Sequence, residues 1–184
     1  MAWGRCMNDM EERVRRLEDR AALDDLVVRY FLAADCDDLD ALGACFTEDA
    51  TFAGSGLPNA TSRQGIVSFI AEARSHMGLT VHTPNYALFT FVDPNHATGL
   101  IGAHLELVLG GESLFGAVRY KDRYVRVDSG WCIAYRDMRT VHIAPWTEVG
   151  EALRSDFPAR WPGGPPMPSD FPRSHPGAAK RAVT

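Results

Sequence analysis

The sequence predicts an α+β domain in which N-terminal helices pack in the concave face of a curved antiparallel sheet, a cone-shaped α+β barrel. Two observations lead to this prediction. Up to about residue 75, apolar residues recur at helical steps of three and four. The stretch that follows alternates with period two and is rich in β-branched and aromatic residues. Helices followed by hairpins are typical of a layered α+β plan, and a wrapped sheet leaves a cavity suited to a ligand.

A long amphipathic helix is expected near the start of the chain. From about Met10 to Ala34, apolar residues recur at steps of three and four, with charged residues between them. The stretch DDLDALGACF at residues 37–46 predicts a second, short helix with Asp37 or Asp38 as its cap. The apolar residues that share one face of this short helix are Leu39, Leu42 and Phe46.

A third helix and four long strands are expected next, after a brief strand and a Gly/Pro loop at TFAGSGLP. The spacing Thr61-x-x-Gln64 matches a capping box, and apolar residues at helical steps follow it. Beyond this helix the turn sequences DPNH, GGES and DSGW separate alternating runs, which indicates consecutive hairpins. The predicted strands are Val81 to Val92, Ala97 to Leu109, Leu114 to Val127, and Trp131 to about Ile143.

The length of 184 residues fits one domain with a tail. We expect the α+β barrel to span residues 10–145 and residues 146–184 to form a Pro- and Gly-rich C-terminal extension without a periodic core face. Large aromatic side chains are unfavourable in water, so we expect the extension to dock on the domain or on a neighbouring subunit. Our hypothesis is that it docks at the cavity mouth and acts as a lid. The aromatic residues of this extension are Trp146, Phe157, Trp161 and Phe171.

Composition and charge exclude several classes of function. The net charge is −5 and no basic run exceeds RVRR, so nucleic-acid binding is not expected. No apolar signal region and no run of about 18 apolar residues is present, which predicts a cytoplasmic protein without membrane contact. No motif indicates a metal, flavin or nucleotide, so we expect no cofactor and a small hydrophobic substrate. The cysteines, expected to be reduced structural thiols, are Cys6, Cys36, Cys45 and Cys132.

Asp35 and His82 are the expected catalytic pair. Asp35 occurs while the apolar stripe of the long helix is still running, so its carboxylate is expected to point inward. A lone histidine in a strand is more often only a hydrogen-bonded residue. A facing aspartate changes this, because a carboxylate that accepts from an imidazole N–H selects the tautomer and stabilises the imidazolium. We therefore predict a hydrogen bond of about 2.6–3.2 Å and a general base at His82.

Strand periodicity sorts the remaining candidates, because residues i and i+2 share a face. His82 is grouped with Tyr86, and His104 is expected on the same inner side of the sheet as Tyr120 and Arg136. A bulge would exchange the two faces. Apolar residues on the other face of the second strand predict that the outer face needs cover, as in a homodimer or homotrimer. These residues are Ile101, Ala103, Leu105 and Leu107.

Three stretches resemble the SnoaL-like branch of the nuclear transport factor 2-like superfamily. They are LEDRAALDDLVVRYFLAADCDDLDALGACFTEDATF, the VHTPN segment that holds His82 and Asn85, and RYKDRYVRVDSGWCIAYRDM. The resemblance covers roughly Leu17 to Pro145. It implies the α+β barrel fold, with scytalone dehydratase and lindane dehydrochlorinase as the mechanistic models.

The resemblance also implies roles for single residues. Asp35 and His82 match the aspartate and the histidine base of a catalytic dyad. Tyr30 matches a tyrosine that polarises the substrate carbonyl through water, and His104 matches a second catalytic histidine. Arg136 matches an active-site arginine. The other predicted substrate-binding residues are Tyr120, Asn85, Phe31 and Trp146.

Two of these residues fit a structural role equally well on the sequence alone. Tyr30 lies on an apolar helical stripe, where a core tyrosine is as common as a catalytic one. Arg136 lies on a strand and fits an ion pair with Asp122.

The predicted function is that of a cofactor-independent lyase of the dehydratase type. His82 takes a proton next to an activating group and a leaving group departs from a small hydrophobic cyclic or polyketide-like substrate. The first alternative is an isomerase or cyclase that uses the same base, which product mass separates from a lyase. The second is a non-catalytic protein that binds a small ligand.

Overall fold

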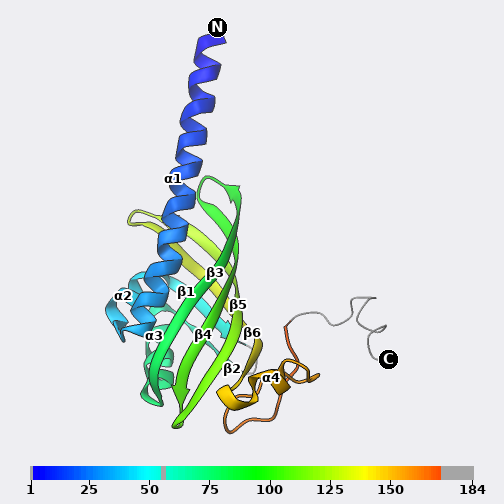
Figure 1. Ribbon diagram of the computed structural model, residues 1–184. Helices are drawn as coiled ribbons and strands as arrows, with labels where there is room; N and C mark the ends of the chain where they lie inside the picture. The colour runs from blue at the N-terminus through cyan, green and yellow to red at the C-terminus, as the bar shows by residue number, and fades with distance from the viewer. Residues whose placement is uncertain (1, 55–56, 171–184) are drawn as a thin grey trace, which may run out of the picture.

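The computed structural model describes residues 2–54 and 57–170. Three helices precede the long strands, and the first is much longer than the others (Figure 1). These helices are α1 (Ala2–Asp35), α2 (Leu39–Ala44) and α3 (Arg63–Ser75). The strands are β1 (Phe46–Gly54), β2 (Leu57–Thr61), β3 (Met77–Asp93), β4 (His96–Leu109), β5 (Glu112–Val127) and β6 (Gly130–Pro145).

The strands form one curved six-stranded sheet in the order β2-β1-β6-β5-β4-β3. Strands β3 to β6 pair as consecutive antiparallel hairpins, which confirms the predicted meander within one or two residues at most ends and four at the start of β3. Strand β1 pairs with β6 in parallel, so the sheet is mixed, whereas a fully antiparallel sheet was predicted. Period-two alternation gives the faces of a strand but carries no information on its direction.

Helix α1 lies across the concave face of the sheet and extends well beyond it at its N-terminal end (Figure 1). The side of α1 that meets the sheet carries buried apolar residues. These residues share one side because they recur at steps of three and four along the helix. These residues are Leu23, Leu26, Val27, Tyr30, Phe31 and Ala34. In the described residues, no helix is both long and apolar enough to cross a membrane.

The helix caps follow the predicted residues at α2 but not at α3. Asp38 caps α2, and its side chain accepts from the backbone N–H of Ala41 at 2.9 Å. Helix α3 is capped by Ser62, which accepts from the N–H of Gly65 at 3.2 Å. The predicted capping box at Thr61 is therefore wrong by one residue. A serine adjacent to a threonine offers the same capping group, and spacing alone does not choose between them.

A β-bulge at Asn85 decides which residues of β3 face the helices. Pro84 pairs with Ala103 and Tyr86 pairs with Gly102, so Asn85 has no partner on β4. The extra residue reverses the alternation. His82 therefore faces the core, whereas Tyr86 faces outward, and the predicted shared face of these two residues is wrong.

The register of β4 corrects the predicted faces of that strand. Leu105 pairs with His82 and Thr83 pairs with His104, so Leu105 faces inward and His104 faces outward. The residues expected on the outer face are buried in the core instead, namely Ile101, Ala103, Leu105 and Leu107. The argument from these residues for a covered outer face is therefore wrong, and the oligomer stays a prediction.

The chain after β6 folds back against the sheet. It forms a short 3-10 helix, η1 (Trp146–Glu148), and α4 (Val149–Ala152). Ala159 then forms a parallel bridge with Ile143, where β1 no longer covers the edge of β6. Asp170 is held by Arg119, whose Nη2 donates to its carboxylate at 2.5 Å. Phe171 lies outside the described residues.

Candidate active site

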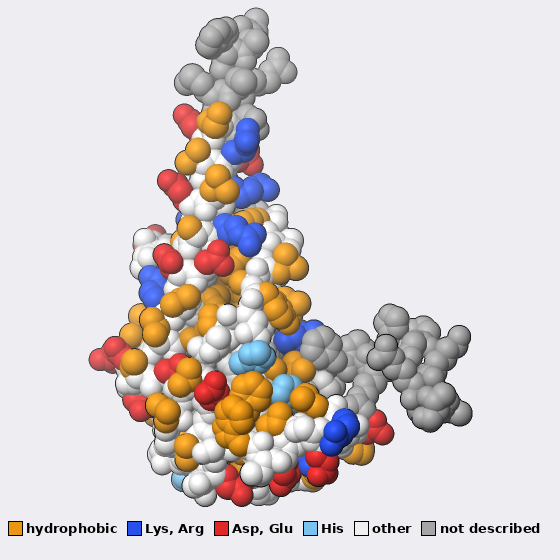
Figure 2. Space-filling model, viewed as in Figure 1, with side chains coloured by type: hydrophobic (Ala, Val, Ile, Leu, Met, Phe, Trp, Pro, Cys, Tyr) orange, Lys and Arg blue, Asp and Glu red, His pale blue; other side chains and the backbone are white. Residues whose placement is uncertain are grey.

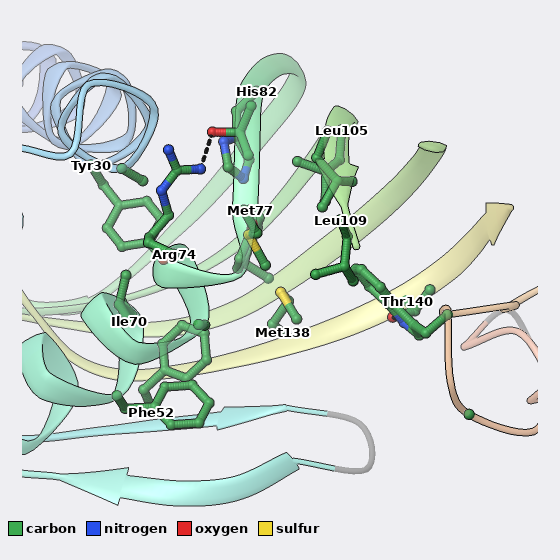
Figure 3. Close-up of a pocket in the computed structure, with 18 of the residues that line it drawn as sticks. Tyr30, Phe52, Ile70, Arg74, Met77, His82, Leu105, Leu109, Met138 and Thr140 are labelled. Carbon is green, nitrogen blue, oxygen red and sulfur yellow. Dashed lines mark hydrogen bonds between the residues drawn. The ribbon is translucent and has the colours of Figure 1, made fainter. Parts of the chain in front are cut away.

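A cavity of about 470 Å³ lies between α3, the C-terminal half of α1 and the concave face of the sheet. Its walls are mostly apolar, and Figure 3 shows Ile70 of α3, Met77 of β3, Leu105 and Leu109 of β4, and Met138 of β6 around it. The C-terminal segment contributes Trp161, Gly164, Pro165 and Met167 to the wall. The polar side chains that line the cavity are Tyr30, Arg74, Thr80, His82, Tyr120 and Thr140.

His82 and Asp35 are hydrogen-bonded at one end of the cavity. Nδ1 of His82 lies 2.6 Å from Oδ1 of Asp35, and the backbone N–H of His82 donates to Oδ2 at 2.8 Å. The predicted hydrogen bond is therefore confirmed. The two side chains are 13% and 17% exposed, respectively. Asp35 is the last residue of α1, so the end of the helix delivers its carboxylate to the neighbouring strand β3.

The hydrogen bond sets the tautomer of His82. An ionised carboxylate only accepts, so Nδ1 of the ring carries the proton that faces Asp35. In the neutral ring, Nε2 then holds the lone pair. His82 lines the cavity, and Asp35 lies behind it and does not. This is the arrangement of an imidazole base oriented by an aspartate.

Phe31 stacks on the His82 ring. The two ring centroids are 4.9 Å apart and the planes differ by 9°. Phe31 is buried and does not line the cavity, although it was predicted as a substrate-binding residue. Its contact limits rotation of the imidazole instead.

Thr80 and Arg74 extend the polar end of the cavity, and sequence reasoning missed both. Nη1 of Arg74 donates to Oγ1 of Thr80 at 2.6 Å, and Oγ1 donates to Oδ1 of Asp35 at 3.0 Å. Arg74 also holds Asp37 through Nε and Nη2, at 2.6 and 3.1 Å. Because a guanidinium only donates, the single hydroxyl proton of Thr80 is left to point at Asp35.

The hydrogen bonds keep Asp35 ionised. Burial acts to raise its pKa, but the bonds from the ring and backbone of His82 and from Thr80 lower it more. The net result is a pKa below the ordinary value of an aspartate. A carboxylate that stays charged stabilises an imidazolium on His82 once the ring has taken a proton.

Tyr30 and Tyr120 form the adjacent wall, with ring centroids 6.3 Å apart. Both are buried, and burial raises the pKa of Tyr30 and places that of Tyr120 well above its ordinary value. The phenols therefore remain protonated at neutral pH and keep their donor capacity. The predicted cavity positions of Tyr30 and Tyr120 agree with this wall.

Arg136 lies behind these tyrosines and does not line the cavity. Its guanidinium is fully buried, donates to both carboxylate oxygens of Asp122 at 3.0 and 2.6 Å, and stacks 4.1 Å from the Tyr30 ring centroid. The structure thus places Arg136 outside the cavity wall in which substrate contact was predicted, and the alternative ion pair with Asp122 is present. A buried carboxylate requires such a partner.

Three further predicted site residues lie outside the cavity wall. His104 is on the outer face, where its ring lies 5.4 Å from that of Phe115, so it does not reach the cavity. Asn85 is the exposed bulge residue of β3. Trp146 is largely exposed and packs on Phe115, at 5.0 Å between ring centroids. The bulge explains why Tyr86 faces outward, and the register between β3 and β4, which periodicity does not specify, explains the outward position of His104.

A signal for Thr80 was present in the sequence. Thr80 precedes His82 by two residues, so period-two alternation places both on one face of the strand. Arg74 occupies the last turn of α3, where a basic residue is also explained by the helix dipole. Its function as the partner of Thr80 depends on how α3 packs against β3, which the sequence pattern does not specify.

Comparisons with known proteins agree with this fold. A protein from Novosphingobium aromaticivorans that is described as a scytalone dehydratase has a TM-score of 0.68 at 20% identity. The alignment covers 73% of this chain and 91% of that one. A hexachlorocyclohexane dehydrochlorinase, LinA-type3, from Novosphingobium barchaimii has a TM-score of 0.68 at 21% identity, covering 72% and 93%. An NTF2-like protein with a cystatin-like fold from Novosphingobium aromaticivorans has a TM-score of 0.62 at 26% identity, covering 70% and 86%.

A comparison with curated proteins finds no match. The model of the SnoaL-like domain family matches residues 15–137, which is more than half of the chain and includes Asp35, His82 and every strand except the end of β6. The match covers the elements that carry Asp35 and His82, whereas the cavity-wall residues Met138 and Thr140 and those of the C-terminal segment lie beyond it. The chain therefore belongs to the SnoaL-like domain family.

Proposed function

We propose that this protein is a cofactor-independent lyase of the dehydratase type. The observation that supports this most is the His82–Asp35 hydrogen bond at the polar end of an otherwise apolar cavity. A histidine in this position, with Nε2 free and an ionised carboxylate at Nδ1, is equipped to remove a proton from a bound molecule.

The reaction begins with removal of a proton from a carbon next to an activating carbonyl. Nε2 of His82 takes this proton, and Asp35 stabilises the imidazolium. The electrons of the C–H bond form a carbon–carbon double bond as the bond to a β-hydroxyl group breaks. The imidazolium then returns its proton to the departing oxygen, so that the products are an unsaturated ketone and water and the base is regenerated.

Tyr30 and Tyr120 stabilise the charge that develops on the substrate carbonyl oxygen. Their phenols are protonated donors in a buried wall, where a hydrogen bond is electrostatically stronger than in water. Arg136 contributes by its contact with the Tyr30 ring, which holds the phenol in place from behind. It is a positioning residue in this scheme, and His104 has no function in it.

The cavity favours a neutral, largely hydrophobic substrate. Its volume of about 470 Å³ and apolar walls suit a molecule of one or two fused rings with its oxygen functions at the His82 end. Arg74, the cation in the wall, is already bound to Asp37 and Thr80. A substrate with a fixed negative charge is therefore disfavoured.

The C-terminal extension serves as a lid in this proposal. Trp161, Pro165 and Met167 supply part of the cavity wall, and Nε1 of Trp161 donates to Oγ1 of Thr140 at 3.4 Å. By covering the apolar end, the extension excludes water from the site and strengthens the interactions of the His82 base.

The test uses a bicyclic β-hydroxy ketone as a probe substrate in deuterated water. Wild-type protein is expected to catalyse α-deuterium exchange and to form the unsaturated ketone with loss of one water, both measured by mass spectrometry. His82→Ala is expected to abolish both reactions. His104→Ala is the matched control, because it removes an exposed histidine outside the cavity and is expected to leave both rates unchanged.

The outcomes separate the alternatives. Exchange without loss of water, followed by a rearranged product whose mass differs from the substrate only by the deuterium gained, indicates an isomerase or cyclase with the same base. Tight binding of the probe without any exchange indicates a ligand-binding protein. Equal activity of the His82→Ala variant and the wild type contradicts the proposed base.

A further inference from the structure

The N-terminal part of α1 carries a stripe of apolar side chains that are exposed in the described fold. This part of the helix projects away from the domain (Figure 1), and Figure 2 shows hydrophobic side chains along it with acidic and basic ones beside them. Met10, Val14 and Leu17 are 57%, 46% and 69% exposed. Leucine and methionine side chains exposed in a row on one helix favour burial against a partner. We name Met10, Val14, Leu17 and Ala21 the α1 seam.

The spacing of the α1 seam is that of a coiled coil. Its residues follow one another at steps of four, three and four, which places Val14 and Ala21 at a positions and Met10 and Leu17 at d positions of a heptad. Upstream, the sequence continues the same spacing with Trp3 and Met7. A β-branched residue at a with leucine at d is the combination that favours two parallel helices.

The residues beside the seam carry complementary charges. The e positions are acidic, with Glu11, Glu18 and Asp25, and the g positions are Arg13 and Arg20. In a parallel pair of helices each g residue meets the e residue five positions later in the partner. Arg13 then faces Glu18, and Arg20 faces Asp25. An antiparallel pair would instead bring arginine to arginine and acid to acid.

The seam lies on the side of α1 opposite the domain. Leu23, Leu26 and Tyr30, which face the sheet, are buried, and the exposed Val28 and Leu32 continue the outward side toward the end of the helix. A helix from a second copy, laid along the seam, would therefore not clash with the domain of the first copy. The two domains lie on the outer sides of the helix pair.

We propose that the α1 seam binds the α1 seam of a second copy of this chain in a parallel, two-stranded coiled coil. The charge pattern selects this occupant, because the e and g residues complement themselves in register. The inference does not depend on the proposed catalytic function, and it provides a dimer contact that leaves the cavity open.

The first test measures the mass of the full chain by sedimentation at tens of micromolar. The wild type is expected to sediment at twice the chain mass of 20.3 kDa. The Val14→Glu/Leu17→Glu variant is expected to sediment at the chain mass, with an unchanged circular-dichroism melting transition of the domain. The matched control is Leu88→Glu/Val92→Glu, which places the same charges on exposed apolar residues of β3 and is expected to leave the dimer intact.

The second test uses the charges. Arg13→Glu/Arg20→Glu makes both flanks acidic, and Glu18→Arg/Asp25→Arg makes both basic, so each variant alone is expected to be monomeric. An equimolar mixture is expected to regain the dimer mass. This result separates specific g–e′ pairing from general loss of apolar contact.

Several results would overturn the proposal. One is a wild type that is monomeric throughout the concentration range. Another is an oligomer that survives Val14→Glu/Leu17→Glu and dissociates with the β3 control, which assigns the interface to the sheet. Failure of the two charge variants to combine on mixing rejects the parallel register.

Discussion

Two aspartate pairs in this fold differ in exposure, namely Asp35 with His82 and Asp122 with Arg136. Asp35 and His82 are 17% and 13% exposed, and His82 lines the cavity. Asp122 and Arg136 are fully buried behind the tyrosine wall. The family resemblance implied a catalytic base at His82 and a substrate-binding Arg136, with an ion pair to Asp122 as the alternative for Arg136. Only the first pair has an atom that a bound molecule can reach.

The difference in exposure separates a pair that can transfer protons to a substrate from a pair that only stabilises the fold. A fully buried pair has lost its hydration, so it is retained only where each charge keeps its partner, and it neither exchanges protons nor meets substrate. A pair that stays partly exposed keeps enough access for proton transfer while its carboxylate still orients the ring. The predictions below test this division, beginning with the largest expected effect.

Removal of the proposed base is expected to have the largest effect. His82→Ala should lower kcat on the probe by a factor on the order of 10²–10⁴, because proton transfer by a positioned side chain contributes this much. Asp35→Asn is expected to lower kcat with little change in KM, since it disturbs the tautomer of His82 and leaves the cavity wall intact. Steady-state kinetics measure both. Wild-type turnover by either variant contradicts the assignment of this pair to chemistry.

The fully buried pair of Asp122 and Arg136 is expected to contribute to the free energy of unfolding. Arg136→Met leaves Asp122 as an unpaired buried charge and should lower the free energy of unfolding by about 3–5 kcal/mol. Arg136→Met/Asp122→Asn removes that charge and keeps an acceptor for the Tyr124 hydroxyl, which donates to Asp122 at 2.6 Å. It should recover a large part of the loss in urea denaturation. A single variant as stable as the wild type would show that this pair is dispensable.

The hydroxyl of Thr80 is expected to have an intermediate effect. Thr80→Val keeps the shape of the side chain but removes the donor to Asp35, and one such bond contributes about 1 kcal/mol. The expected result is a fall in kcat of roughly fivefold to tenfold. Thr80→Ser is the control, because it keeps the hydroxyl. Equal kinetics for Thr80→Val and Thr80→Ser contradict a function of Thr80 in orienting the carboxylate.

The C-terminal segment is expected to affect catalysis by the His82–Asp35 pair but not the stability of the domain. Deletion of residues 146–184 should lower kcat/KM several-fold, because it opens the apolar end of the cavity to water, while the circular-dichroism spectrum of the domain stays nearly the same. Trp161→Ala is the milder variant and removes one wall residue. Full activity in both variants would leave the segment with no function as a lid.

The pH dependence of stability is expected to show the smallest effect. The folded pKa of Asp35 is lowered, so its ionised form stabilises the fold above the ordinary pKa of about 3.9, and this contribution is lost as the pH falls through the lowered value. The difference in unfolding free energy between the wild type and Asp35→Asn should therefore shrink below about pH 4. Urea denaturation from pH 7 to pH 3 measures it. A difference that grows on acidification contradicts the direction of the pKa change.

Much of the fold follows from local patterns. The four long strands were predicted to within a few residues, since alternation and turn residues specify a hairpin without reference to the rest of the chain. The inward direction of Asp35 was also predicted, because an acid on an apolar helical stripe is unfavourable without a partner. The stripe and its partner strand together indicated the hydrogen bond to His82 that the structure contains.

The sequence by itself determined the order of elements and the inward direction of Asp35, because each depends on periodicity along one segment. The pairing of Asp35 with His82 was inferred from the cost of an unpartnered carboxylate and from the family resemblance. The tertiary structure decided the faces of β3 and β4, which rest on one bulge at Asn85 and on the pairing of Leu105 with His82. It also decided that Arg136 is sealed from the cavity and that Arg74 reaches Thr80. Exposure and contacts between distant segments arise only when the layers pack, and no local period encodes them.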